Sequence, residues 1–510
     1  MVWAYVARRA LAGLMILLLA SLLMFVLVSE SGDPLADLLA SNSPNREQLI
    51  EARIEALNLD DPLLVRYVDW LGGAATCLVP FGGCDLGTNI DGQEVTAMLA
   101  KAMSSTLRLV LIATILAIVL GVAVGIASAL REYSVFDYST TLLAFLFFSL
   151  PIFWVAVLLK QFGAIEFNNW LADPVFSAGF IAASSLVIGA AFAALVGRAR
   201  WRVGTAAAAV TAATLAAMNA TGWWRNPSLG PLLVGILAAA TSVGATVLLA
   251  GLERRRVLAV GLLTVGLGTA VAMLARPLLV DPTWAGLALL GAFVTGAGCC
   301  AAWLLADPAD RPAALQVAVI SALAVGAFVF LDYLLANLAP YSEAVGGRAI
   351  PTIGSQTPNF QGNLWQTVLD NLLHLILPAI AIMLVSFAAY SRFTRASLLD
   401  TLQTDYVRTA RAKGLPERTV VLRHAFRNAL IPVTTLAALD FGAVIGGAVI
   451  TETVFGWHGM GELFTDGLRI PDVNQVMGFF VVVAVSVVLF NLLADLSYAW
   501  LDPRIRLEGP

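Results

Sequence analysis

The sequence predicts an all-α protein that crosses a membrane many times. Hydrophobic residues make up 59% of its 510 residues and charged residues only 13%, whereas soluble domains carry about a quarter charged residues. The mean hydropathy is +0.84. Long apolar runs alternate with short clusters of Arg, Asp, Gly and Pro, a pattern typical of helices joined by loops at two membrane surfaces. The formal net charge of −4 disfavours nucleic-acid binding, which needs a concentrated basic face.

Twelve apolar segments are long enough to form membrane-spanning helices, because a run of about 20 apolar residues satisfies its own backbone groups in hydrocarbon. The predicted spans are 10–28, 105–130, 141–160, 178–197, 203–220, 230–250, 257–275, 283–305, 313–336, 371–390, 429–452 and 475–500. The first span is too long for the apolar core of a usual signal peptide, and no small-residue cleavage pattern follows it. We therefore expect it to stay attached as a transmembrane helix.

Positive charges orient these spans in the cell membrane. The short loops 198–202 and 253–256 carry basic clusters, whereas the loops that follow each of them carry one basic residue each, Arg225 and Arg276. Short cytoplasmic loops hold an excess of Lys and Arg. The alternation predicts a multi-pass protein with both termini in the cytoplasm and with Arg225 and Arg276 outside.

The first long loop, residues 29–103, then lies outside the cytoplasm and contains two of the four cysteines. Cys77 and Cys84 are seven residues apart, and Pro80 and the glycines at 82–83 permit a tight turn between them. Because this location is oxidising in many bacteria, we expect a disulfide. Two free thiols are the alternative.

The second long loop, residues 391–428, is predicted to be cytoplasmic and is strongly basic. Residues 405–432 read DYVRTARAKGLPERTVVLRHAFRNALIP. The pattern is amphipathic and helical, with a break at 414–416, where Gly can end one helix and Pro can begin the next. It predicts a compact helix–turn–helix. On charge alone, a loop held near anionic lipid headgroups is the simpler interpretation.

The order of residues in this loop resembles a known signature. Arg408-Thr409-Ala410 followed by Gly414 resembles the EAA loop of ABC import permeases, in the form found in the dipeptide/oligopeptide/nickel family. In that family the loop forms a coupling helix that docks into a cleft of the ATPase subunit. The glutamate of the general motif is replaced by Arg408, as in the peptide branch. The resemblance implies ATPase coupling for Arg408, Thr409, Ala410, Lys413, Gly414, Arg423, His424 and Arg427.

The resemblance extends along most of the chain. Further segments that are similar to the family are 31–34, 57–71, 85–87, 149–154, 377–379, 451–455, 459–461, 495–496 and 502–506. They imply the six-helix fold of a type I ABC importer permease over residues 1–170 and 345–510. Between 174 and 339 the resemblance stops, and six extra spans are predicted there. An even number of spans preserves the orientation of the shared helices, so we expect an accessory block.

The resemblance implies a transmembrane permease subunit of an ATP-driven importer that moves dipeptides or oligopeptides by alternating access. Its implied partners are a paralogous permease in a heterodimeric pore, one or two ABC ATPase subunits and an extracytoplasmic peptide-binding protein. The sequence contains no GxxxxGK[ST] loop, HExxH or GxSxG motif, so we expect no enzyme activity and no bound cofactor. ATP and Mg²⁺ are expected on the partner ATPases.

Two other functions stay open at this stage. Nickel import within the same family is the first, although the shared helices have few His or Cys and no metal site is expected. A secondary transporter is the second, but such carriers usually show repeats and functional charges in the membrane. Asp440, inside the span 429–452, either lines the pathway or hydrogen-bonds a neighbouring helix, since a carboxylate there is costly otherwise.

Overall fold

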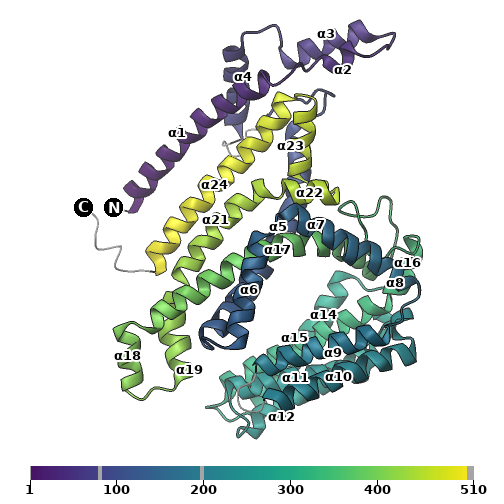
Figure 1. Ribbon diagram of the computed structural model, residues 1–510, viewed down its shortest axis with the longest axis vertical. Coiled ribbons are helices and arrows are strands. Elements are labelled where there is room, and N and C mark those ends of the chain that lie inside the picture. The colour runs from purple at the N-terminus through teal and green to yellow at the C-terminus, as the bar shows by residue number, and fades with distance from the viewer. Residues whose placement is uncertain (1, 78–82, 196–199, 502–510) are drawn as a thin grey trace. The chain divides into compact units, whose positions relative to one another are not determined.

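The computed structural model describes residues 2–77, 83–195 and 200–501, which fold into two compact helical units (Figure 1). Unit 1 contains Met1–Gly163, Thr352–Ser355 and Leu375–Pro510, and unit 2 contains Ala164–Pro351 and Gln356–His374. No strand occurs in these described ranges, apart from a single isolated bridge between Thr88 and Glu94. Part of the expected basic loop at 198–202 and all of the segment 502–506 lie outside the described residues.

Unit 1 is formed by the two ends of the chain. Its helices are α1 (Val2–Ser29), α2 (Ala36–Leu39), α3 (Arg46–Leu57), α4 (Leu63–Thr76), α5 (Val95–Ala129), α6 (Val135–Ser149), α7 (Ile152–Leu158), α18 (Asp405–Ala412), α19 (Glu417–Thr419), η3 (Val420–Ala425), α20 (Phe426–Ala429), α21 (Ile431–Gly447), α22 (Val449–Phe455), α23 (Met460–Arg469) and α24 (Val473–Leu501). Two further helices, η1 (Leu159–Glu166) and α17 (Leu364–Leu402), have residues in both units.

Unit 2 contains the block in which the family resemblance stops. Its helices are α8 (Phe167–Ala172), α9 (Ala178–Leu195), α10 (Arg200–Thr221), η2 (Trp223–Arg225), α11 (Gly230–Leu249), α12 (Arg255–Leu274), α13 (Arg276–Leu279), α14 (Trp284–Leu305), α15 (Arg311–Ala336) and α16 (Leu338–Ala344). The predicted block 174–339 lies inside this unit.

A described helix overlaps each of the twelve predicted spans, and the all-α polytopic class is confirmed. Within the described residues, nine helices are long and apolar enough to cross a membrane, or ten if the bent pair α6 and α7–α8 counts as one span. The apolar part of α9, Ala178–Ala194, is shorter, and α21 has 17 residues.

The prediction of one continuous helix over 141–160 is wrong. The chain bends by 103° between Ser149 and Ile152. Pro151 cannot donate an amide hydrogen bond, and its ring disfavours helical geometry at Leu150. Accordingly, Leu150 is extended with a ψ of 127°, and a new helix begins after Pro151. The segment 149–154 therefore forms a corner and not a continuous helix.

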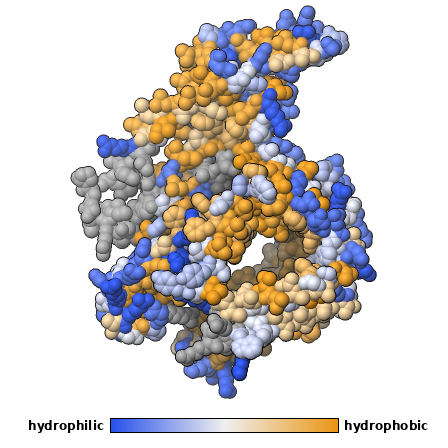
Figure 2. Space-filling view, in the orientation of Figure 1, coloured by the Kyte–Doolittle hydropathy of each residue, from blue (hydrophilic) through white to orange (hydrophobic). Residues whose placement is uncertain are grey.

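The core of unit 1 joins α1, α4 and α24 around aromatic side chains. The rings of Phe25 and Tyr67 pack edge to face with centroids 5.5 Å apart, and Tyr67 shares a 2.9 Å hydrogen bond with Ser21 inside α1. In Figure 2 the hydrophilic side chains of this unit gather around α2–α3 and on α18–α19, with an apolar band between them. That arrangement suits a protein whose middle faces lipid.

Small residues allow the helices of unit 2 to approach closely. The backbones of α9 and α10 meet at Gly189 and Gly204, where an added Cβ at either glycine would lie 2.8 Å from the carbonyl oxygen of the other. In the group α11, α12, α14 and α15, Ser321 donates a 2.8 Å hydrogen bond to Ser242. Small and hydroxyl residues at helix contacts are typical of membrane bundles, where the hydrophobic effect does not drive helix association.

Candidate functional site

The basic loop folds into a helical hairpin, α18–α20, between α17 and α21 (Figure 1). Helix α18 ends at Ala412, and Gly414 follows with a φ of +74°. This left-handed conformation costs a glycine nothing but strains a residue with a Cβ. Pro416 then occupies the N-cap position of α19. The predicted helix–turn–helix with a break at Gly414 is therefore present.

One face of the hairpin is held by a small apolar core. Val407 and Ala410 of α18 pack with Val420 and Ala425 on the returning arm and with Leu398 of α17. The opposite face of α18 carries charged side chains. Across the turn, Arg411 donates two hydrogen bonds to Glu417, at 3.1 and 2.6 Å, and this contact lowers the pKa of Glu417. Exposed pairs of this kind add at most about 1 kcal/mol, so the apolar core is the main support.

The structure brings the predicted coupling residues together on this hairpin. Of the set, Ala410 is buried and His424 is half-buried. The exposed members are Arg408, Thr409, Lys413, Gly414, Arg423 and Arg427. The hairpin thus presents a compact basic surface on a fixed scaffold. Its part in ATPase coupling stays a prediction.

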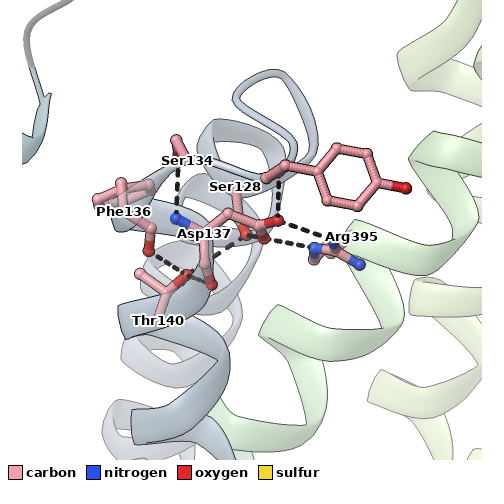
Figure 3. A network of polar contacts seen from close by, with 7 residues as sticks. Ser128, Ser134, Phe136, Asp137, Thr140 and Arg395 are labelled. Carbon is pink, nitrogen blue, oxygen red and sulfur yellow. Dashed lines mark hydrogen bonds and ion pairs between the residues drawn. The ribbon is translucent and has the colours of Figure 1, made fainter.

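An ion pair between a buried carboxylate and a partly exposed arginine, which sequence reasoning missed, anchors α17 beside this hairpin (Figure 3). Asp137, with 2% of its surface exposed, accepts hydrogen bonds from Arg395 Nε at 2.6 Å and Nη2 at 2.8 Å. Ser128 Oγ donates at 2.5 Å, and the Tyr133 amide donates at 3.1 Å. The α5–α6 corner is thereby clamped to α17, seven residues before that helix ends at Leu402.

Local sequence held a partial signal for this clamp. Ser134 is the N-cap of α6, and its side chain accepts from the Asp137 amide at 3.1 Å. An N-cap serine with an acidic residue three positions later is close to a capping box. The signal gives the helix start but not the partner, because Arg395 is 258 residues away.

A second buried carboxylate connects α5 with α22 and α23. Glu452 has no exposed surface. It accepts 2.6 Å hydrogen bonds from Thr106 Oγ1 and from the Gly461 amide, while Thr106 Oγ1 accepts from the Met460 amide at 2.8 Å. An added Cβ at Gly459 would lie 2.6 Å from the Glu452 carboxyl group. The segments 451–455 and 459–461, which resemble the family, therefore form one packed unit.

Asp440 lies on α21 and faces α17. Tyr390 donates a 3.0 Å hydrogen bond to Asp440 Oδ2. Such a contact with a neighbouring helix is one of the two roles expected for this residue. The other role, in lining the pathway, stays a prediction.

Two basic side chains inside the predicted spans were also not identified from the sequence. Lys160 on η1 donates to the Val454 carbonyl at 3.1 Å. Arg108 on α5 donates to the Ser355 carbonyl at 3.4 Å and lies 5.4 Å from the ring centre of Trp457. Their position within apolar runs could have indicated a functional or structural role, since charged residues in a membrane span usually face a partner or a cavity.

The cysteines of the first long loop are joined in the structure. Cys77 and Cys84 form a disulfide with their Cα atoms 4.1 Å apart, and residues 78–82 between them lie outside the described ranges. We expect mass spectrometry of alkylated, unreduced protein to find neither thiol modified. The closed loop is short, so removing the bond should cost no more than about 2 kcal/mol. Alkylation of both thiols would show that the bond is absent in cells.

Comparison with known proteins gives both a family and relatives. The family described as binding-protein-dependent transport system inner membrane component matches residues 117–507. This range includes the hairpin α18–α20, the clamp residues Asp137 and Arg395, and Glu452.

Three relatives illustrate the similarity. The oligopeptide transport system permease protein OppB of Mycobacterium bovis is 41% identical over 181 residues, which cover 36% of this chain and 56% of the relative. The oligopeptide transport system permease protein AppB of Bacillus subtilis is 44% identical over 156 residues, covering 31% and 48%. The dipeptide transport system permease protein DppB of Escherichia coli is 45% identical over 138 residues, covering 27% and 41%. Each aligned region spans only 41–56% of these relatives' length.

Proposed function

Because the chain belongs to the family of binding-protein-dependent transport system inner membrane components, we propose that it is the transmembrane permease subunit of an ATP-driven peptide importer. The proposed cargo is dipeptides or oligopeptides, in keeping with the names of its relatives. The observation that carries the proposal is the exposed basic hairpin α18–α20. It has the residue order expected of a coupling loop and stands on an apolar core.

The proposed mechanism is alternating access driven by separate subunits. Two ABC ATPases bind ATP and Mg²⁺ and move toward each other. This closure moves the hairpin, and the hairpin swings the transmembrane helices between inward-open and outward-open states. The Asp137–Arg395 pair supports this step, because it ties α17 to the α5–α6 corner close to the hairpin. A paralogous permease completes the pore, and an extracytoplasmic binding protein delivers the peptide.

A valine at Gly414 is expected to uncouple ATP hydrolysis from uptake. Gly414 has a φ of +74° and open space where a Cβ would lie, so backbone strain is the effect of the substitution within this chain. A left-handed conformation costs a residue with a Cβ about 1–2 kcal/mol, and β-branched residues tolerate it least. We expect Gly414→Val to assemble normally but to lower peptide uptake about tenfold, as measured in membrane vesicles.

Two variants control for strain as such. Gly251 has a φ of +81° and equally open surroundings, so Gly251→Val introduces similar strain into a different loop and should leave uptake unchanged. Gly414→Asn should restore uptake, since asparagine tolerates the left-handed region. Normal uptake by Gly414→Val would contradict the coupling role.

Purification of the full chain from its native membrane should also recover the ATPase and permease partners.

The predicted block 174–339 is proposed to be an accessory bundle outside the pore. If so, cysteines introduced at Arg225 and Arg276 should be labelled from outside the cell and one at Arg255 only from inside, in a background without native cysteines. Replacing the block with a short polar linker should preserve some uptake, since the shared helices keep their orientation. Outside labelling at Arg255 would overturn the topology. Complete loss of uptake in an assembled deletion variant would mean that the block acts in transport.

A further inference from the structure

Unit 2 contains an apolar cavity of about 140 Å³ between its helices. Gly291 and Val294 of α14, Val325 and Gly326 of α15, and Leu279 and Trp365 line it. The indole nitrogen of Trp365 donates to the Leu279 carbonyl at 2.7 Å, so Trp365 offers no further hydrogen-bond donor. The pocket is open on one side, and its apolar walls offer water too few polar partners to hold it there, so an apolar guest is favoured. The volume suits part of a hydrocarbon chain and is too small for a drug-sized ligand, whose sites usually measure about 300–1,000 Å³.

The same end of the bundle presents two hydrogen-bond donors without partners. Arg276 and Tyr333 line a second, smaller pocket of mixed polarity that shares Ala272 and Val329 with the wall of the apolar cavity. Within the described part of the chain, no hydrogen bond or ion pair involves either the Arg276 guanidinium or the Tyr333 hydroxyl. The Tyr333 ring stacks on Trp365 with centroids 5.2 Å apart, which links the donors to the cavity.

The carboxylate beside these donors already has partners. Asp332 lines the smaller pocket and accepts hydrogen bonds from the backbone amides of Leu229 and Gly230, at 2.7 and 2.9 Å. Its negative charge is therefore partly stabilised by the backbone amides at the start of α11. Arg276, which follows the end of α12 and is exposed, remains available to an external anion.

We propose that unit 2 binds one glycerophospholipid, with part of an acyl chain in the apolar cavity and the phosphate at Arg276 and Tyr333. Guanidinium groups bind phosphate oxygens through charge-assisted hydrogen bonds. The acyl chain gains little by leaving the bilayer, because lipid tails are as apolar as the cavity wall. The phosphate contact must therefore supply the selectivity, and a lipid without a phosphate should bind weakly.

Two glycines allow the cavity to be filled without disturbing its walls. An added Cβ at Gly291 or Gly326 would meet no atom within 4 Å. The double variant Gly291→Leu/Gly326→Leu should therefore occupy the space of the acyl chain. Gly296, also on α14 with open surroundings but outside the cavity lining, gives the matched control Gly296→Leu.

Native mass spectrometry of the full-length protein in detergent, titrated with phosphatidylglycerol or with diacylglycerol of the same chains, tests the proposal. We expect one tightly held phosphatidylglycerol and about tenfold weaker binding of diacylglycerol. The filled variant should bind phosphatidylglycerol about tenfold more weakly, because its leucines keep the acyl chain from seating while the phosphate is at Arg276, and Gly296→Leu should not. Arg276→Gln should remove the preference for phosphate, whereas Arg225→Gln, whose arginine already pairs with Asp173, should retain it.

Unchanged binding by the filled variant, or an equal loss in Gly296→Leu, would overturn the site, because the lipid would then be held by the general surface. Equal affinity for diacylglycerol, or no effect of Arg276→Gln, would overturn the phosphate contact. Should the filled variant fail to fold, photo-crosslinking of the native chain decides the question. A phosphatidylglycerol with a photoreactive acyl chain should label 287–294 and 325–330, and labelling elsewhere alone would contradict the proposal.

Discussion

Replacement of Arg395 by methionine is expected to destabilise the protein by about 2–3 kcal/mol, because the buried Asp137 loses its charged partner, although Arg395 itself is 29% exposed. Asp137 is 2% exposed, and Arg395 provides two of its hydrogen bonds. The loss should lower the thermal unfolding midpoint of the purified protein in detergent. Uptake should fall as well, since α17 would no longer be fixed to the α5–α6 corner.

Arg392 provides a matched control one turn earlier on the same helix. Its guanidinium lies 4.5 Å from the ring centre of Phe148 and has no carboxylate partner within the described ranges. Arg392→Met should therefore cost much less. The double variant Asp137→Asn/Arg395→Met should recover most of the lost stability, because neither charge remains alone. Equal effects of the two single arginine substitutions would show that the ion pair has no special role.

An alanine at Gly461 is expected to have the second large effect. Its Cβ would lie 2.5 Å from the Val449 Cα and 2.7 Å from Glu452 Oε2. Overpacking a core typically costs about 1–3 kcal/mol. A shift of α23 would also weaken the hydrogen bond from the Gly461 amide to Glu452, and an unsatisfied buried acceptor costs about 1–3 kcal/mol more.

The matched control for this variant is Gly72→Ala. Gly72 also lies within a helix of unit 1, α4, but an added Cβ there would meet nothing within 4 Å. Alanine in open helical positions is neutral or stabilises by about 0.5–1 kcal/mol. Thermal unfolding of both variants in the same detergent gives the comparison. A Gly461→Ala protein as stable as Gly72→Ala would mean that the tight packing around Glu452 does not exist in solution.

The Asp137 and Glu452 networks hold α5 at two separate points, one at its C-terminal end and one about a third of the way along the helix. Thr106 meets Glu452, and Ser128 meets Asp137. At 1.5 Å per residue these two contacts are roughly 33 Å apart along the helix, about the thickness of the hydrocarbon core. Helix α5 therefore links the region of the hairpin to the α22–α23 region, and a substitution at either clamp should affect both stability and transport.

Sequence alone determined the features that depend on neighbouring residues. Apolar run length gives the spans, because a helix in hydrocarbon must satisfy its own backbone. The Gly-Leu-Pro break gives the hairpin, because a left-handed residue and a proline N-cap are local properties of the backbone. The spacing of Cys77 and Cys84 suggested the disulfide for the same reason. Residue order in 405–414 and the collinear segments also identified the family.

Only the tertiary structure decided which charges meet. Asp137 and Arg395 are 258 residues apart, and Thr106 and Glu452 are 346 apart. Nothing in the composition of either segment identifies the other, because pairing depends on how the helices pack after folding. The corner at Leu150–Pro151 shows the same division. The sequence predicts a continuous span over 141–160, because a proline alone can leave a span merely kinked. The 103° angle depends on what each half packs against.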